Sequence, residues 1–418
     1  MTGSLLVRRA RLVPVGRPAA HAGPVDVLVR DGVVVAVAPE LDDSGHPALE
    51  ADGRWLAPGL WDHHVHLAQW ARTRLRLDVS GTASPAEVVA RVAARLAGQP
   101  EEPVLVGFGY RSGPWDRQPT VAELDAVAGP RPVVLISGDA HNGWLSSAAL
   151  ALLGVPARQG ALDENDWFPV LARLSDLPMD RAADEQAYAA AVADAAARGV
   201  VGVTDMEFGR GYVEWPERVS RGVRSLRARP ATYLDTLEAV LAAGLRTGQP
   251  LPGGEGLVTM GPLKIISDGS LNTRTAYCHE PYRDAADLDL PRGKLNVPTD
   301  ELVEVLRRAH THGLSTAVHA IGDAAVSAAL DAYAASGARG SIEHAQLLGP
   351  GDPSRMAALG VTASVQPAHL LDDRDVTQRY WPDRAERCFV LATLWRAGVR
   401  LALGSDAPVA RLDPWLAM

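Results

Sequence analysis

Three histidines fall within four positions in the stretch GLWDHHVHLAQW, residues 59–70. If this stretch is a strand, side chains two positions apart share a face, so Asp62, His64 and His66 point the same way. His63 then points the opposite way, and we expect it to have a structural role. His64 and His66 on one face form a chelating pair, because imidazole nitrogens are common metal ligands. The spacing therefore predicts a metal site that uses two of the three histidines.

Four later segments supply further groups of this kind, each at the point where a polar side chain interrupts or ends an apolar run. They are Lys264 in GPLKIISDG, His319 in TAVHAIGD, His344 in SIEHAQ and Asp406 in ALGSDAP. A buried Lys or Asp without a partner is energetically costly. One such residue is compatible with a satisfied core group, but six that converge on one site are better explained by bound metal ions.

The elements that position these residues follow a regular alternation of strand and helix patterns. We expect strands at 60–66, 200–206, 225–233, 261–269, 314–323, 340–347, 361–369 and 399–408. We expect helices at 180–198, 234–244, 300–312, 324–335, 353–359 and 388–397. This order predicts an α/β fold, a (β/α)8 TIM-like barrel, whose active sites lie at the carboxyl ends of the strands.

The barrel order holds only if about 70–178 is an α/β subdomain inserted after the first strand. This stretch has signals of its own, because Ser84 with Glu87 and Thr120 with Glu123 have the spacing of helix capping boxes. The segments PVLVGFGY and PVVLISGD in it read as strands.

Before the barrel, residues 4–13 and 25–38 alternate or run apolar, with Asp31-Gly32 as a hairpin turn. The predicted domains are therefore a small, incomplete β-sandwich module at 1–55 and a barrel at 56–418.

Composition excludes several classes of protein. The chain has 418 residues and a net charge of -9 without a basic cluster, which argues against a nucleic-acid partner. Its two cysteines, Cys278 and Cys388, are too few for a disulfide framework and suit a reducing cytoplasm. Its apolar runs are too short to cross a membrane. We expect a cytoplasmic protein that acts on a small molecule and has no membrane contact.

The sequence resembles the amidohydrolase superfamily, and within it the YtcJ-like or N-substituted formamide deformylase-like branch, the amidohydrolase 3 group. The resemblance covers nearly the whole chain. It is carried by DVLVRDGVVVAVAP, APGLWDHHVHL, GPLKIISDGSLNTRTA, VHAIGDAAVSAALDAY, SIEHAQLL, SVQPAH and LGSDAPV, and in the insertion by ELDAVAGPRPVVLISGDAHNGWLSSAAL.

The resemblance implies a role for each candidate ligand. His64 and His66 would bind the more buried of two divalent metal ions together with Asp406, and His319 and His344 would bind the second ion. Lys264 matches the position that many members carboxylate with CO2, so its carbamate would bridge both ions. A buried Lys beside two cations favours the neutral amine that this reaction needs. The donor set suits Zn²⁺, while Mn²⁺ and Fe²⁺ stay open. The alternative for Lys264 is a salt bridge to Asp406 or Asp268 in a one-metal site.

The reaction implied by the resemblance is hydrolysis of a non-peptide C–N bond of the amide type, such as an N-substituted formamide or acyl amine. The metals would lower the pKa of bound water towards about 7 and so supply a hydroxide nucleophile. Asp406, as the catalytic residue, would accept the water's proton and pass it to the leaving amine. Two alternatives stay open, namely a metal-dependent deaminase of a cyclic amidine and a non-catalytic or incomplete barrel.

Weaker signals concern the substrate. Candidate substrate-binding residues are His141, Trp144, Asp268, Arg274, Gln366 and His369. For Arg274 the alternative is a pair with Asp268, and for His141 a hydrogen bond within its own loop.

One departure from the family pattern is that the sequence stops twelve residues after Asp406. We therefore expect a barrel that is C-terminally truncated relative to the family, with an exposed eighth strand that favours a homo-oligomer.

Overall fold

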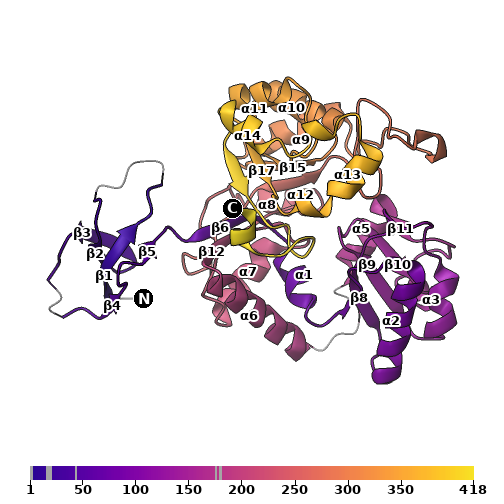
Figure 1. Ribbon diagram of the computed structural model, residues 1–418, viewed down its shortest axis with the longest axis horizontal. Helices are drawn as coiled ribbons and strands as arrows, with labels where there is room; N and C mark the ends of the chain where they lie inside the picture. The colour runs from indigo at the N-terminus through magenta and orange to yellow at the C-terminus, as the bar shows by residue number, and fades with distance from the viewer. Residues whose placement is uncertain (1–2, 16–20, 43–44, 175–176, 178–180) are drawn as a thin grey trace. The chain divides into compact units, whose positions relative to one another are not determined.

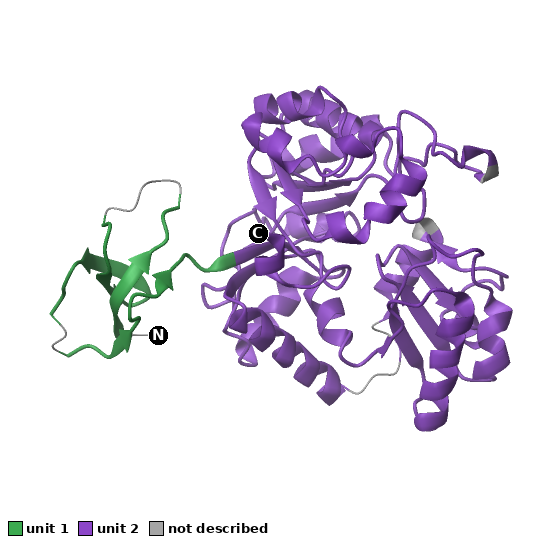
Figure 2. Cartoon of the chain, in the orientation of Figure 1, with its two compact units in different colours: residues 1–60 green, residues 61–418 purple. Residues whose placement is uncertain are grey.

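The computed structural model describes the chain except for residues 1–2, 16–20, 43–44, 175–176 and 178–180. It divides into two compact units, Met1–Leu60 and Trp61–Met418 (Figure 2). The boundary lies a few residues after the one that the sequence predicts.

The first unit is built on short strands around β1. Its strands are β1 (Ser4–Leu12), β2 (Val25–Arg30), β3 (Val33–Ala38), β4 (Ala48–Glu50) and β5 (Trp55–Leu56). Asp31 and Gly32 both have positive φ, 50° and 79°, as a two-residue hairpin between β2 and β3 requires. The described strands of this unit form one sheet of order β3-β2-β1-β4, in which β5 also pairs with β1. The second sheet of the predicted sandwich stays a prediction.

The second unit contains the strands predicted for the barrel. These strands are β6 (Leu60–Val65), β12 (Val200–Asp205), β13 (Arg227–Pro230), β14 (Leu263–Ile266), β15 (Thr316–Ala320), β16 (Gly340–His344), β17 (Thr362–Val365) and β18 (Leu401–Leu403). His64, His319 and His344 lie at or near the carboxyl ends of their strands, whereas Lys264 lies within its strand and Asp406 follows the last one.

Two sheets arise from these strands in the described part of the chain. One has the order β13-β12-β6, and the other is parallel with the order β14-β15-β16-β17-β18. A parallel bridge between Thr232 and Leu263 links the first sheet to β14. At the other edge, the backbone N–H of Asp406 donates to the carbonyl of His64 at 2.6 Å. The segment after β18 is thereby fixed against the end of β6.

Helices alternate with these strands and cover them. They are α6 (Arg181–Ala197), α7 (Gly211–Ser220), α8 (Leu237–Ala242), α9 (Thr299–Thr311), α10 (Asp323–Ser336), α11 (Asp352–Leu359) and α14 (Leu391–Arg396). In Figure 1, α9, α10 and α11 pack together beside β15. Leu302 and Leu306 of α9 are fully buried in one core with Val318 and Ile342 of the strands. Of the helices in this list, α7 was not predicted, because Pro216 in its interior disrupts the pattern of a helix.

Shorter elements complete this unit. They are α1 (Leu67–Arg72), α12 (His369–Asp372), α13 (Arg374–Tyr380), α15 (Pro414–Ala417) and the 3-10 turns η2 (Ala285–Asp287) and η3 (Ala385–Arg387). No described helix is long and apolar enough to cross a membrane.

The segment between α1 and α6 folds around a sheet of its own. Its elements are β7 (Leu77–Asp78), α2 (Pro85–Gly98), β8 (Leu105–Tyr110), α3 (Val121–Ala128), β9 (Val133–Ser137), β10 (Asn142–Leu145), α4 (Ser147–Leu152), β11 (Leu162–Asp163) and α5 (Glu164–Ala172). The described strands pair in the order β11-β10-β9-β8-β7. Ser84 caps α2, and Thr120 and Glu123 form the predicted capping box at the start of α3.

The strand β10 was not predicted, since the sequence GDAHNGW looks like a loop. Gly143 of this strand lies under Trp167, and a Cβ at this position would meet the indole ring at 2.3 Å. The strands β9 and β10 form a hairpin whose tip carries Asp139 and His141.

Candidate metal centre

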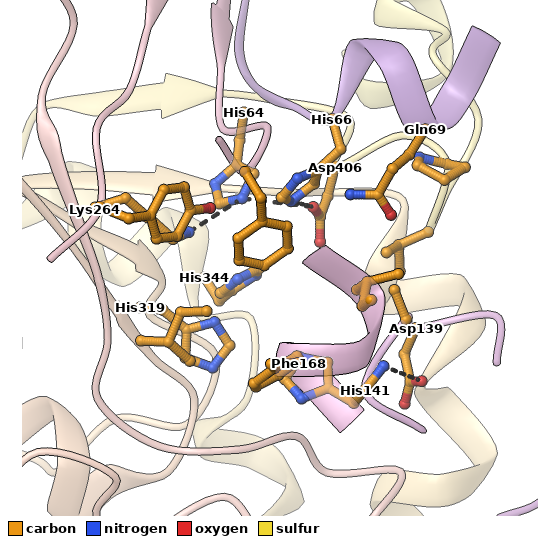
Figure 3. A pocket seen from close by; sticks show the side chains of 17 residues that line it. His64, His66, Gln69, Asp139, His141, Phe168, Lys264, His319, His344 and Asp406 are labelled. Atoms are coloured by element: carbon orange, nitrogen blue, oxygen red, sulfur yellow. Dashed lines mark hydrogen bonds and ion pairs between the residues drawn. The ribbon is translucent and has the colours of Figure 1, made fainter. Parts of the chain in front are cut away.

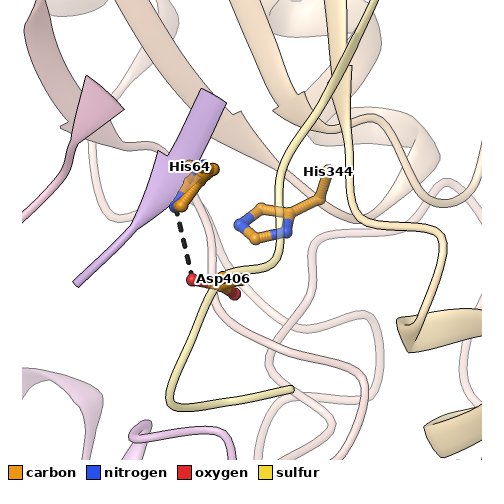
Figure 4. Close-up of side chains that lie close together, drawn as sticks. All are labelled: His64, His344 and Asp406. Carbon is orange, nitrogen blue, oxygen red and sulfur yellow. Dashed lines mark ion pairs between the residues drawn. The ribbon is translucent and has the colours of Figure 1, made fainter. Parts of the chain in front are cut away.

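His64, His66 and Asp406 converge where β6 ends and the segment after β18 begins. Asp406 Oδ1 lies 3.4 Å from His64 Nε2 and 3.5 Å from His66 Nε2. Ligand atoms of His64, His344 and Asp406 all lie within 4.8 Å of one another (Figure 4). One carboxylate oxygen and several imidazole nitrogens thus face a common point.

Local sequence explains this close approach. Asp62 Oδ1 accepts hydrogen bonds from the backbone N–H groups of His64 and Ser405, both at 3.0 Å, and so ties β6 to the segment that carries Asp406. Gly404 completes the fit, because a Cβ there would lie 2.6 Å from the backbone nitrogen of His64. A larger residue at this position would push Asp406 away from the histidines.

The other candidate ligands line the same cavity. Lys264 of β14 places its Nζ 3.3 Å from His64 Nε2. The rings of His319 and His344 lie 4.6 Å apart, and those of His64 and His344 lie 5.1 Å apart. All six predicted ligands, His64, His66, Lys264, His319, His344 and Asp406, line this cavity (Figure 3).

Burial shifts the pKa values of these groups. It lowers the pKa of His66 to about 3 and holds the pKa values of His64, His319 and His344 well below the ordinary range. These imidazoles are therefore neutral, the form in which they bind a metal ion. Burial also lowers the pKa of the Lys264 amine and raises that of Asp406 to about 7.

The residues fit a bound metal ion. Among the described residues, His344 Nδ1 and His369 Nε2, the latter 3.6 Å from Asp406 Oδ2, are buried without a hydrogen-bond partner. Buried polar atoms are rarely left in this state, and several at one place indicate a missing ligand. Nitrogen donors with a carboxylate oxygen are the set that Zn²⁺ prefers.

Glu343 orients one of the ligands and was missed by the sequence analysis. Its Oε2 accepts a hydrogen bond from His64 Nδ1 at 2.6 Å, and both side chains are 1% exposed. This bond leaves His64 Nε2 free to face Asp406. The available signal was an acidic residue within the apolar strand β16, directly before His344.

Backbone geometry lets neighbouring residues of β16 reach one site. Alternation along a strand would place Glu343 and His344 on opposite faces. The backbone of His344 has φ 69° and that of Ala345 has φ 43°, so the chain turns at this point. Asp406 also has a left-handed backbone, with φ 58°. Two of the candidate ligands therefore occupy a conformation that residues other than glycine rarely adopt.

His63 lies on the other face of β6, as the spacing predicts. Its ring lies 6.3 Å from that of Trp61, and burial lowers the pKa of His63. We expect His63→Ala to keep the metal content of the wild type, whereas His64→Ala should lose metal. Elemental analysis of both purified variants checks this, and loss of metal in His63→Ala would overturn the face assignment.

Replacement of Glu343 by Gln should weaken metal binding by about 10- to 100-fold, because His64 loses the carboxylate that fixes its tautomer. Competition with a chromogenic chelator measures this affinity. The matched control is Glu304→Gln, which alters an exposed residue of α9 paired with Arg307 and should leave the affinity unchanged. Equal affinities in the two variants would show that Glu343 does not support the metal site.

The substrate-binding candidates separate into two groups. His141 lines the cavity from the hairpin tip, with its ring 5.6 Å from that of His319. His369, at the start of α12, stacks on His344 and places Nε2 3.6 Å from Asp406 Oδ2. These two residues stay candidates for substrate contact.

The other four candidates have partners within the fold, and their contact with substrate stays a prediction. Trp144 is fully buried in the core of the inserted sheet, and its indole N–H donates to the carbonyl of Thr120 at 2.7 Å. Arg274 pairs with Asp284 at 2.5 Å rather than with Asp268.

Asp268 and Gln366 are also held by the fold. Asp268 is fully buried, accepts backbone N–H groups of Ile321 and Gly322, and lies 3.4 Å from His319 Nε2. It therefore supports His319. Gln366 is buried at the end of β17 and donates to the carbonyl of Ser364.

An apolar wall was missed as well. Beside the candidate ligands, the cavity is lined by Gln69, Phe168, Leu171, Phe208, Tyr233 and Ile266. These residues come from the insertion, from α1 and from the ends of other strands. Nothing in their local sequence separates them from core residues.

The chain is similar to several known proteins. The model of the amidohydrolase family matches residues 48–418. The chain is 28% identical to the putative amidohydrolase YtcJ of Bacillus subtilis and 26% identical to the N-substituted formamide deformylase of Arthrobacter pascens, in each case over 93% of this chain and 78% of the relative. A crystal structure of an uncharacterized metal-dependent hydrolase from Pyrococcus furiosus matches with a TM-score of 0.77 and 25% identity, over 99% of this chain and 87% of that one.

Proposed function

The chain belongs to the amidohydrolase family, and from this premise we propose that it hydrolyses a non-peptide C–N bond of the amide type, carried on a (β/α)8 barrel. The observation that carries the proposal is the convergence of His64, His66, Lys264, His319, His344 and Asp406 on one buried cavity. Similarity to an N-substituted formamide deformylase supports N-substituted formamides as the first substrates to examine.

The residues divide between two cations in this proposal. His64, His66 and Asp406 would hold one divalent ion, and His319 and His344 the other, with Zn²⁺ favoured by the donor set. When bound, such ions polarise a carbonyl group and make water a stronger acid.

Lys264 is proposed to react with CO2 and join the two ions. Burial lowers the pKa of its amine and so favours the neutral form, which can form the new N–C bond and release a proton. The rival assignment was a salt bridge to Asp406 or Asp268. Among the described residues, Lys264 has no ion pair within 4.0 Å, and its nearest polar contact is His64 Nε2.

In this proposal Asp406 is the general base. It lies on the cavity wall between His66 and His369, so a water molecule beside it can give up its proton to the carboxylate. The same group can then return the proton to the leaving nitrogen. The apolar wall of Phe168, Phe208 and Tyr233 lies beside these groups and would limit the entry of further water.

Metal content and turnover together test the proposal. Protein prepared with bicarbonate and without chelator should contain about two metal equivalents per chain. It should release formate and an amine from N-substituted formamides, and chelation should stop this release. About one equivalent, with ammonia released from cyclic amidines, would favour a deaminase. A folded protein with no metal and no turnover would overturn the proposal.

A further inference from the structure

Gln69 lies in the cavity but has no role in the ligand set. It belongs to α1, five residues after His64, and it is 5% exposed. It lines the same cavity as the candidate ligands. Figure 3 shows its carboxamide beside His66 and Asp406.

Glu207 fixes the orientation of this carboxamide. Glu207 Oε1 accepts a hydrogen bond from Gln69 Nε2, and Oε2 accepts one from the Gln69 backbone N–H, both at 3.0 Å. The backbone N–H of Phe208 also donates to Glu207 Oε1, at 3.1 Å. An ionised carboxylate accepts hydrogen bonds and does not donate, so the NH2 group of Gln69 must face Glu207.

The other polar atom of the Gln69 side chain is its carbonyl oxygen, Oε1. Among the described residues, Oε1 is buried and has no hydrogen-bond partner. A buried carbonyl without a partner is unfavourable, and a ligand that donates a hydrogen bond to it gains the bond that the protein lacks. This oxygen is therefore the hydrogen-bonding atom that the fold leaves unused in a side chain that lines the cavity.

The surrounding wall is apolar and largely aromatic. The rings of Phe208 and Tyr233 lie 4.8 Å apart, and those of Phe168 and Phe208 lie 6.4 Å apart. Leu171 and Ile266 extend the wall. Such a surface favours an apolar substituent on the ligand.

We propose that Gln69 determines substrate specificity by accepting the N–H of a secondary amide through Oε1, so that the enzyme selects amides with one apolar substituent on nitrogen over amides with two substituents. The inference rests on the proposed amide hydrolysis and adds the class of amide and the residue that selects it.

The test compares N-butylformamide with N-butyl-N-methylformamide, which differ by one methyl group on nitrogen. We expect the wild type to prefer the N–H compound in kcat/KM. Gln69→Leu should lose about 10- to 100-fold on the N–H compound and little on the N-methyl compound. The preference then falls towards unity. An unchanged preference in Gln69→Leu would overturn the inference while leaving amide hydrolysis intact.

Control variants test whether Gln69→Leu changes substrate recognition rather than folding. Gln249→Leu alters an exposed glutamine outside the cavity lining, whose Oε1 accepts a hydrogen bond from the backbone N–H of Arg246. It should keep the wild-type preference. Gln69→Met repeats the test with a different shape if Gln69→Leu does not fold, and metal content should be unchanged in both.

Binding to chelator-treated protein gives a second readout, measured by ligand-observed NMR with the same two formamides. A preference for the N–H compound that Gln69→Leu removes supports the inference even when the wild type hydrolyses neither compound, a result that would count against the proposed function alone. Equal binding of the pair to wild-type protein would overturn the inference.

Discussion

Asp406→Asn is expected to lower kcat for amide hydrolysis by about 100- to 10,000-fold, the contribution typical of a positioned general acid or base. Asn has nearly the same shape as Asp and keeps the hydrogen bond from the Asp406 backbone to His64, so the fold should persist. The amide cannot take a proton from water, and it is a weaker ligand for a cation than a carboxylate. Steady-state kinetics with an N-substituted formamide measures the loss.

Metal content must be followed in the same variant. If Asp406→Asn keeps its metal and still loses turnover, the loss belongs to proton transfer. The matched control is Asp331→Asn, which alters an exposed residue of α10 paired with Arg355 and should retain wild-type kinetics. Turnover by Asp406→Asn within about threefold of the wild type would exclude Asp406 as the base, since that change is far below the expected range.

Lys264→Met is expected to remove one of two bound metal ions and to abolish a carbamate signal. The chain has two lysines, Lys264 and Lys294, so carbon-13 NMR after labelling with 13C-bicarbonate should show a carbamate carbon that can be assigned by mutation alone. The signal should disappear in Lys264→Met and persist in Lys294→Met. Burial of Lys264 is the physical reason, because the neutral amine reacts with CO2.

Elemental analysis of the same samples gives the second half of this result. Metal content should fall from about two equivalents to about one in Lys264→Met, since the bridging group is lost. Lys294→Met should keep both ions. Wild-type protein with one ion and no carbamate signal would instead support a mononuclear site with an unmodified lysine.

Most of the strands and helices could be predicted from the sequence, because the hydrophobic periodicity that indicates them depends on neighbouring residues. Each predicted strand is present, and the capping residues Ser84 and Thr120 begin helices as expected. The spacing of His64 and His66 also gave the correct face, because alternation along a short strand leaves little freedom.

The parts of the site that the sequence does not reveal depend on packing between distant segments. Trp144 and Arg274 carry side chains suited to substrate binding, but the core of the insertion and Asp284 engage them. Glu343 was missed because alternation placed it opposite His344, and the turn of the backbone at His344 is not visible in residue types. The orientation of the Gln69 carboxamide is set by a hydrogen bond to Glu207, which lies 138 positions further along the chain.

The left-handed backbone at His344 and Asp406 has a consequence for how this protein can evolve. Each such residue costs on the order of 1–3 kcal/mol in folding free energy, which glycine would largely avoid. Selection for thermal stability alone would therefore act against the backbone conformation of two candidate ligands. At the metal centre, folding stability and retention of the ligand residues therefore oppose each other. More heat-resistant variants that keep these ligands have to gain their stability in other parts of the molecule.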